Sequence, residues 1–230
     1  MSTKHSLTAL REAIAIVRPL LRGEEVNFSG ATFNVRGVRL DFRPRADIPI
    51  FMAARGPNAV KACGEVADGL IVSNMCTAAF VVRCVERMCE SAKAAGRARP
   101  LGVVQYLPCV PRPDRNDAFR AAKFAVAEML PAYWALAQRL PDAKRALLDG
   151  SGITESELAA ATARVASGEV PETVLDDRYV TAFAIAGNIE DCRAQATAHA
   201  AAGVTELALT FSGPSAAADM AYLGAGFAEN

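Results

Sequence analysis

Runs of consecutive apolar residues recur along the chain and predict its buried strands. Strands covered by helices on both faces are apolar throughout, so such runs indicate a parallel sheet rather than a half-exposed one. Apolar residues at helical spacing lie before, between and after the runs. The pattern therefore predicts an α/β fold of about four parallel strands with flanking helices, the strands falling at residues 49–53, 68–73, 101–110 and 204–211.

The clearest unit is IPIFMAARGPNAVKACGEVADGLIVS, residues 48–73, in which two apolar runs flank a short helical segment. This is the pattern of a βαβ unit. In its turn, Gly56 can take backbone angles closed to other residues, and Pro57 suits the first helical position. The amides of Asn58 and Ala59 would then point outward at the positive end of a helix, where a phosphate can bind. An ordinary βα turn fits the same residues, and the pattern alone does not choose between the two.

Two segments depart from the strand–helix rhythm. Residues 24–45 alternate polar and apolar residues and predict a hairpin-like excursion outside the main sheet. Residues 114–181 contain several helical patterns, one of them interrupted at Pro131, and predict a helical insertion after the third strand. We expect one domain over 1–230, organised as a helix (6–22), the excursion (24–45), three βα units (48–111), the insertion (114–181) and the last βα units (187–230). The last part begins with a helix that Asn188 and Asp191 cap.

Composition narrows the class of function. The 25 basic and 25 acidic residues leave no net charge, which argues against a nucleic-acid partner. No apolar run reaches the roughly 20 residues of a membrane helix, and the N-terminal residues lack the hydrophobic core of a signal peptide. The six cysteines form no CxxC motif and the two histidines have no metal-ligand spacing. We therefore expect a cytoplasmic protein with reduced thiols, no membrane contact and no bound metal.

Three segments together resemble one enzyme family. They are RPLLRGEEVNFSGATFNV, then IPIFMAARGPNAVKACGEVADGLIVSN, then GNIEDCRAQATAHAAAGVTELALTF. The sequence resembles the luciferase-like monooxygenase superfamily, and within it the oxidoreductases that depend on the deazaflavin coenzyme F420, a branch that includes the methylenetetrahydromethanopterin reductases. The resemblance covers nearly the whole chain, and it is most specific at the AARGP turn.

The resemblance implies a (β/α)8 TIM barrel, of which this chain would form the C-terminal half. The four predicted strands match the family's last four, and the insertion matches the family's insertion only in character. Barrel enzymes place their chemistry at the carboxyl ends of the strands. In the family the first half supplies much of the pocket around the flavin ring and most of the dimer contacts.

The resemblance also implies roles for individual residues. Arg55 and Gly56 match the turn that binds the cofactor's phosphate-bearing tail, and Asn58 and Ala59 match the helix-start amides beside it. At the tip of the next strand, Ser73 matches a position that contacts substrate in some relatives, and Asn74, just past that strand, is a further candidate for the substrate pocket. The catalytic acid or base stays unknown, because the family's known groups lie in the absent half.

Two functions follow as hypotheses. In the first, the chain is the C-terminal portion of an F420-dependent oxidoreductase or monooxygenase, with FMN as the alternative cofactor, that transfers hydride to or from a small organic substrate. In the second, it is an inactive half-barrel that at most binds a phosphate-bearing ligand or needs a partner chain to complete the barrel. Open strand edges favour a partner, either a second copy or a missing N-terminal half-barrel.

Overall fold

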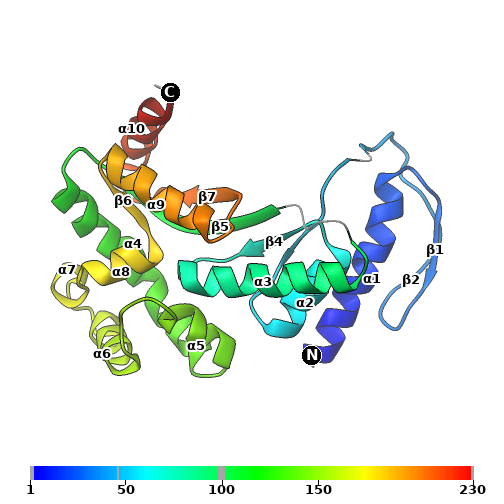
Figure 1. Cartoon of the computed structure of the whole chain (residues 1–230), viewed down its shortest axis with the longest axis horizontal. Coiled ribbons are helices and arrows are strands. Elements are labelled where there is room, and N and C mark those ends of the chain that lie inside the picture. Colours follow the sequence, from blue (N-terminus) through cyan, green and yellow to red (C-terminus); the bar gives the residue numbers. More distant parts are fainter. Residues whose placement is uncertain (1–2, 46, 98–101, 229–230) are drawn as a thin grey trace. The chain divides into compact units, whose positions relative to one another are not determined.

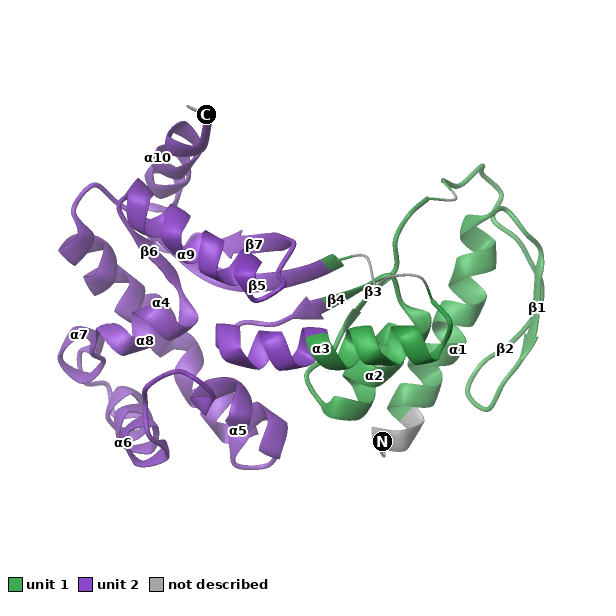
Figure 2. Cartoon of the chain, viewed as in Figure 1, with its two compact units in different colours: residues 1–70, 86–102 green, residues 71–85, 103–230 purple. Residues whose placement is uncertain are grey.

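The computed structural model describes residues 3–45, 47–97 and 102–228, in which helices and strands alternate along most of the chain (Figure 1). The chain forms two compact units, which are coloured separately in Figure 2. Unit 1 contains Met1–Leu70 and Glu86–Gly102, and unit 2 contains Ile71–Val85 and Val103–Asn230. Each unit is described by itself.

Unit 1 carries the N-terminal helix, the hairpin and the first βα unit. Its elements are α1 (Thr3–Leu21), β1 (Val26–Ser29), β2 (Asn34–Val38), β3 (Phe51–Ala53), α2 (Pro57–Val66), the start of β4 (Gly69–Val72) and the end of α3 (Ala78–Ala94). The strands β1 and β2 pair antiparallel, as the alternating pattern over 24–45 predicts.

The hairpin is tied to α1 by one carboxylate. The amides of Ala31, Thr32 and Phe33 donate to the Glu12 side chain over 2.7–2.9 Å. These bonds, with the one from Phe33 the strongest, hold the pKa of Glu12 below its usual value. Gly30 lies against the same carboxyl group, since an added Cβ would overlap it.

A second carboxylate fixes the entry to β4. Asp68 accepts hydrogen bonds from the Arg18 guanidinium and the Ile50 amide, both at 2.9 Å, and from Arg97 at 3.2 Å. Burial tends to raise the pKa of Asp68, but the bonds from Arg18 and Ile50 outweigh it and keep that pKa low. Asp68 therefore has the structural role that its place at the start of a strand predicts.

Unit 2 contains the rest of the sheet, the helical insertion and the C-terminal helices. Its further elements are β5 (Gly102–Pro111), α4 (Arg115–Ala137), α5 (Pro141–Leu148), α6 (Glu155–Ala166), α7 (Pro171–Val174), α8 (Asp177–Phe183), β6 (Ile185–Gly187), α9 (Ile189–Ala201), β7 (Glu206–Thr210) and α10 (Ala216–Ala228). The helices α4 to α8 occupy the range predicted for the insertion.

Parallel pairing defines the sheet of unit 2. Residues 104–108 of β5 pair in parallel with β7, and residues 109–111 of β5 pair in parallel with β6. One face of these strands packs on the helices through a core of Leu107, Cys109, Ile185 and Cys192. Parallel strands with flanking helices confirm the predicted α/β class.

Three local predictions need correction. The helix α4 runs through Pro131 without interruption, because its apolar residues pack against α5, α6, α7, α8 and β6. The strand β6 was not predicted, since three residues are too few to show a period. The strand β7 was expected to be buried, but Glu206 and Thr210 are exposed and the residues between them are only partly covered.

Candidate functional site

The four predicted cofactor-binding residues lie in the turn that joins β3 to α2 and in the first turn of α2. Gly56 is the N-cap of α2, with φ −72° and ψ 150°, and Pro57 is the first helical residue. Arg55 and Ala59 are partly buried, and Asn58 is exposed. All four predicted residues are therefore grouped around one helix start at the carboxyl end of a strand.

The expected reason for glycine at position 56 is wrong. A φ of −72° is open to every residue, so no special backbone angle requires Gly56. Packing does not require it either, because an added Cβ would have no atom within 4 Å. Gly64 in the same helix is different, since a Cβ there would overlap the backbone carbonyl of Met88. A missing side chain at position 56 leaves the space in front of the helix open.

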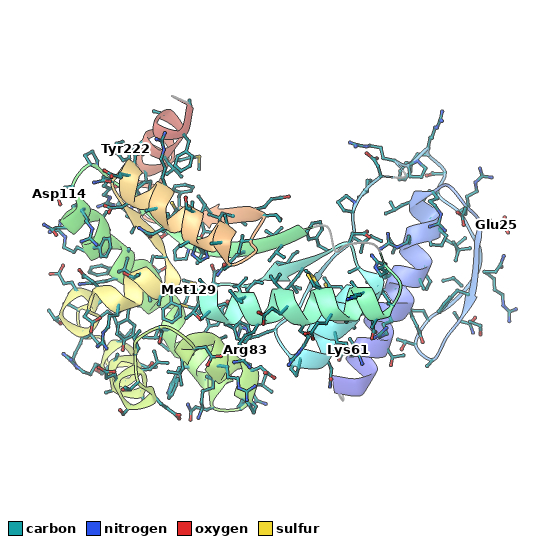
Figure 3. The ribbon with its side chains drawn as sticks, in the orientation of Figure 1. Glu25, Lys61, Arg83, Asp114, Met129 and Tyr222 are labelled. Atoms are coloured by element: carbon teal, nitrogen blue, oxygen red, sulfur yellow. The ribbon has the colours of Figure 1, made fainter. Side chains whose placement is uncertain are left out.

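The electrostatics of this helix start suit an anion. The first amides of a helix have no intrahelical acceptor, and the glycine N-cap offers them no side-chain acceptor. No acidic residue lies in the first turn of α2. Lys61 follows one turn later, with 63% of its side chain exposed and its ammonium 4.0 Å from Glu65 (Figure 3). The donors, the helix dipole and the open space fit a phosphate group.

The predicted substrate residues follow β4 and belong to unit 2. Ser73 is exposed and Asn74 is partly buried. The Ser73 hydroxyl lies 3.5 Å from the Asn74 carbonyl oxygen. Met75 comes next, with φ +57°, the only positive φ of a non-glycine residue in the described part of the chain. Such angles cost energy and persist only where the surroundings impose them, often at ligand sites.

Two further residues hold this segment and were not among the predicted site residues. Gln105 on β5 donates from Nε2 to the Cys76 carbonyl oxygen over 2.8 Å. Thr77 accepts from the Phe80 amide at 3.2 Å and also donates to the Asp149 carbonyl. The signal for Gln105 was its position as the one polar side chain inside the apolar run LGVVQYLPCV.

Two buried titratable groups, one in each unit, fit packing better than acid–base chemistry. Burial raises the pKa of Cys63 to about 11, and its Sγ lies 3.1 Å from the Gly69 carbonyl oxygen. Burial lowers the pKa of His199 on α9, as expected for a packed side chain. A catalytic acid or base is therefore still unassigned.

Metal-binding and membrane-spanning features were also searched for within the described ranges. There, no three side chains of His, Cys, Asp or Glu come close enough together to hold a metal ion. None of the helices in those ranges combines the length and the apolar character that crossing a bilayer requires.

Comparisons of the sequence with known proteins identify the family to which the chain belongs. A family model described as luciferase-like monooxygenase matches residues 1–206. Over 211 residues the chain is 29% identical to a 5,10-methylenetetrahydromethanopterin reductase of Methanolobus tindarius, a match that covers 90% of this chain and 61% of the relative. Over 95 residues it is 33% identical to an F420-dependent glucose-6-phosphate dehydrogenase of Mycolicibacterium gilvum, covering 41% of this chain and 28% of the relative.

Among solved structures, the fold is similar to that of a coenzyme F420 dependent tetrahydromethanopterin reductase from Methanopyrus kandleri. The TM-score is 0.74 at 24% identity, over 96% of this chain and 61% of that one. The chain thus spans about three fifths of the length of the curated reductases that it matches. The model match over residues 1–206 confirms the predicted resemblance, and the chain belongs to the luciferase-like monooxygenase family.

Proposed function

We propose that this chain is the C-terminal part of an oxidoreductase that transfers hydride between coenzyme F420 and a small organic substrate. The observation that carries the proposal is the start of α2, where uncapped amides face open space at Gly56 and no acidic residue lies in the first turn. Relatives named as a methylenetetrahydromethanopterin reductase and an F420-dependent dehydrogenase support a deazaflavin. FMN is the alternative, because its tail also carries a phosphate.

In this proposal the chain binds and orients the cofactor's tail. The amides of Asn58 and Ala59 donate to the phosphate, Gly56 leaves room for it, and Arg55 adds a positive charge beside it. The bound deazaflavin supplies the hydride chemistry. These residues need no acid or base of their own for that role, which agrees with the lack of an assigned proton donor.

The substrate would contact the segment that follows β4. Ser73 presents an exposed hydroxyl and Asn74 an amide, which suit hydrogen bonds to a small polar molecule. The positive φ at Met75 supports a functional role for this segment, because such a backbone angle costs energy and is often found at ligand sites.

We further propose that β3, β4, β5 and β7 are the last four strands of a (β/α)8 barrel, within a single domain over 1–230. Exposed strand faces in unit 2 support this. Tyr106 on β5 is 39% exposed, whereas Leu107, on the opposite face, is fully buried beneath helices. In a closed barrel the Tyr106 face would line the interior. The remaining strands would come from the rest of the protein, a separate chain or a second copy.

The second candidate is a half-barrel that is inactive alone. The partly exposed side chains of β7 support it, because they lack the cover that the further strands of a barrel would give. In either case we place the protein in the cytoplasm, which suits its free cysteines.

The test is a titration followed by the amide NMR signals of Asn58 and Ala59. We expect F420 and FMN to shift both signals, and riboflavin, which lacks only the phosphate of FMN, to leave them in place. For the chain alone we expect dissociation constants weaker than micromolar. Unshifted signals at saturating F420, or equal shifts with riboflavin, would refute the phosphate site. A sub-micromolar constant would refute the need for further strands.

A further inference from the structure

Gln105 is a buried polar residue whose contacts are only half satisfied. Its side chain is fully buried in β5, between Val103 and Leu107, which are also buried on the same face. Nε2 donates to the Cys76 carbonyl oxygen over 2.8 Å, whereas Oε1 is buried and has no hydrogen-bond partner among the described residues. An unpaired buried amide oxygen destabilises a protein. Stability alone therefore does not explain a glutamine at this position.

The bond to Cys76 restrains residues 73–77, which also contact other elements of unit 2. Met75 adopts φ +57° while its side chain is buried in the core of the helical insertion. The Thr77 amide donates to the Ala146 carbonyl oxygen over 3.0 Å, and the Thr77 hydroxyl donates to the Asp149 carbonyl oxygen over 2.5 Å.

The segment also folds back on itself, and the insertion adds a further restraint. The Cys76 thiol lies 3.7 Å from the Asn74 carbonyl oxygen. Asp149 also forms an ion pair with Arg83 of α3, a residue marked in Figure 3. Residues 73–77 therefore connect β4 to α3 in one imposed conformation, and the bond from Gln105 comes from the neighbouring strand.

We propose that Gln105 is a positioning residue that fixes residues 73–77, so that Ser73 and Asn74 are presented to substrate in one geometry. The functional meaning of this role rests on the proposed function. Gln105 reaches the segment through the Cys76 carbonyl group and need not touch substrate. Its Nε2 donor counters the tendency of a non-glycine residue to leave a positive φ at Met75.

The test replaces Gln105 by methionine, which has a similar length and volume but no donor. The matched control is Gln195→Met, because Gln195 also bonds a backbone in unit 2, through Ala186, but is remote in sequence from residues 73–77. Amide hydrogen exchange over residues 73–77 reports how readily that segment opens. Emission of Trp134, the single tryptophan, reports urea unfolding of unit 2.

We expect Gln105→Met to speed exchange over residues 73–77 by about fivefold to tenfold, the effect of one ordinary hydrogen bond, with the urea midpoint unchanged. Gln195→Met should lower the midpoint without a selective effect on that segment. Unchanged exchange in Gln105→Met, or a uniform increase with a lower midpoint, would overturn the positioning role. Failure of F420 to shift the Asn58 and Ala59 signals in the unmodified chain would instead refute the proposed function, and the exchange result would still decide the role of Gln105.

Discussion

Replacing Gly56 by aspartate should stabilise α2 and weaken ligand binding at the same time. The N-cap angles at position 56 lie in the extended region, as a side-chain cap requires, and the space for a side chain is open. The chain shows the expected geometry elsewhere. Asp114 caps α4 by accepting from the Asp117 amide at 2.8 Å, and Asp176 caps α8 by accepting from the Arg178 amide at 2.9 Å.

The two effects have different magnitudes. Glycine is already a tolerable N-cap, so the new side chain adds a few tenths of a kcal/mol, and its charge at the helix dipole adds about 0.3–1 kcal/mol. Together α2 should gain about 1 kcal/mol. A phosphate would lose a charge-assisted hydrogen bond, which contributes about 1.5–3 kcal/mol, and would meet a like charge. Its affinity should fall by roughly tenfold to a hundredfold.

The assay follows both quantities in one sample. Trp134 lies in unit 2, so amide hydrogen exchange of α2 measures the stability change in unit 1. The Asn58 and Ala59 signals in an FMN titration measure binding. The control is Gly56→Ala, which adds a Cβ but no acceptor and no charge, and should weaken FMN binding much less than Gly56→Asp does. Faster exchange of α2 in Gly56→Asp, or FMN shifts equal to those of the unmodified chain, would show that the reasoning is mistaken.

Three further predictions test the architecture. Gly64→Ala should destabilise unit 1 by about 1–3 kcal/mol, because its Cβ would overlap the Met88 carbonyl; unchanged thermal unfolding would contradict that packing. Asp68→Asn should cost about 2 kcal/mol at neutral pH. The folded pKa of Asp68 is lowered, so the stability that its carboxylate contributes is complete above the ordinary pKa near 4 and is lost as the pH falls through the folded pKa. A difference in unfolding free energy between the two proteins that stays constant in acid would argue against these hydrogen bonds. Ellman's reagent should label Cys89 alone in the native chain, since the other cysteines are buried. Fast labelling of a second thiol would contradict the burial of those cysteines.

Local signals predicted many elements well. The capping box of Asn188 and Asp191 marks the start of α9, with both reciprocal bonds present. The helix Glu155–Ala166 likewise begins at a local signal, because Thr154 and Glu157 form a second capping box. The turn before α2, with Pro57 as the first helical residue, was also visible from its residues. These features depend on neighbours within about one helical turn, so short windows of sequence contain the necessary information.

Features that depend on distant residues were not predictable in the same way. Pro131 lies inside α4 because packing within the insertion outweighs the loss of one helical hydrogen bond. The strand β7 has an apolar sequence, but its burial depends on which strands cover it, and the described residues cover it only in part. The importance of Gln105 depends on a carbonyl 29 positions away in sequence.

The sequence by itself determined the α/β class, the family and the place of the turn before α2, because apolar runs, caps and the AARGP motif each depend on residues that are adjacent in the chain. Only the tertiary structure decided whether position 56 requires glycine and how residues 73–77 are held. Open space at Gly56 and the bond from Gln105 to Cys76 exist only once separate segments have packed, and no local pattern records a contact that folding creates.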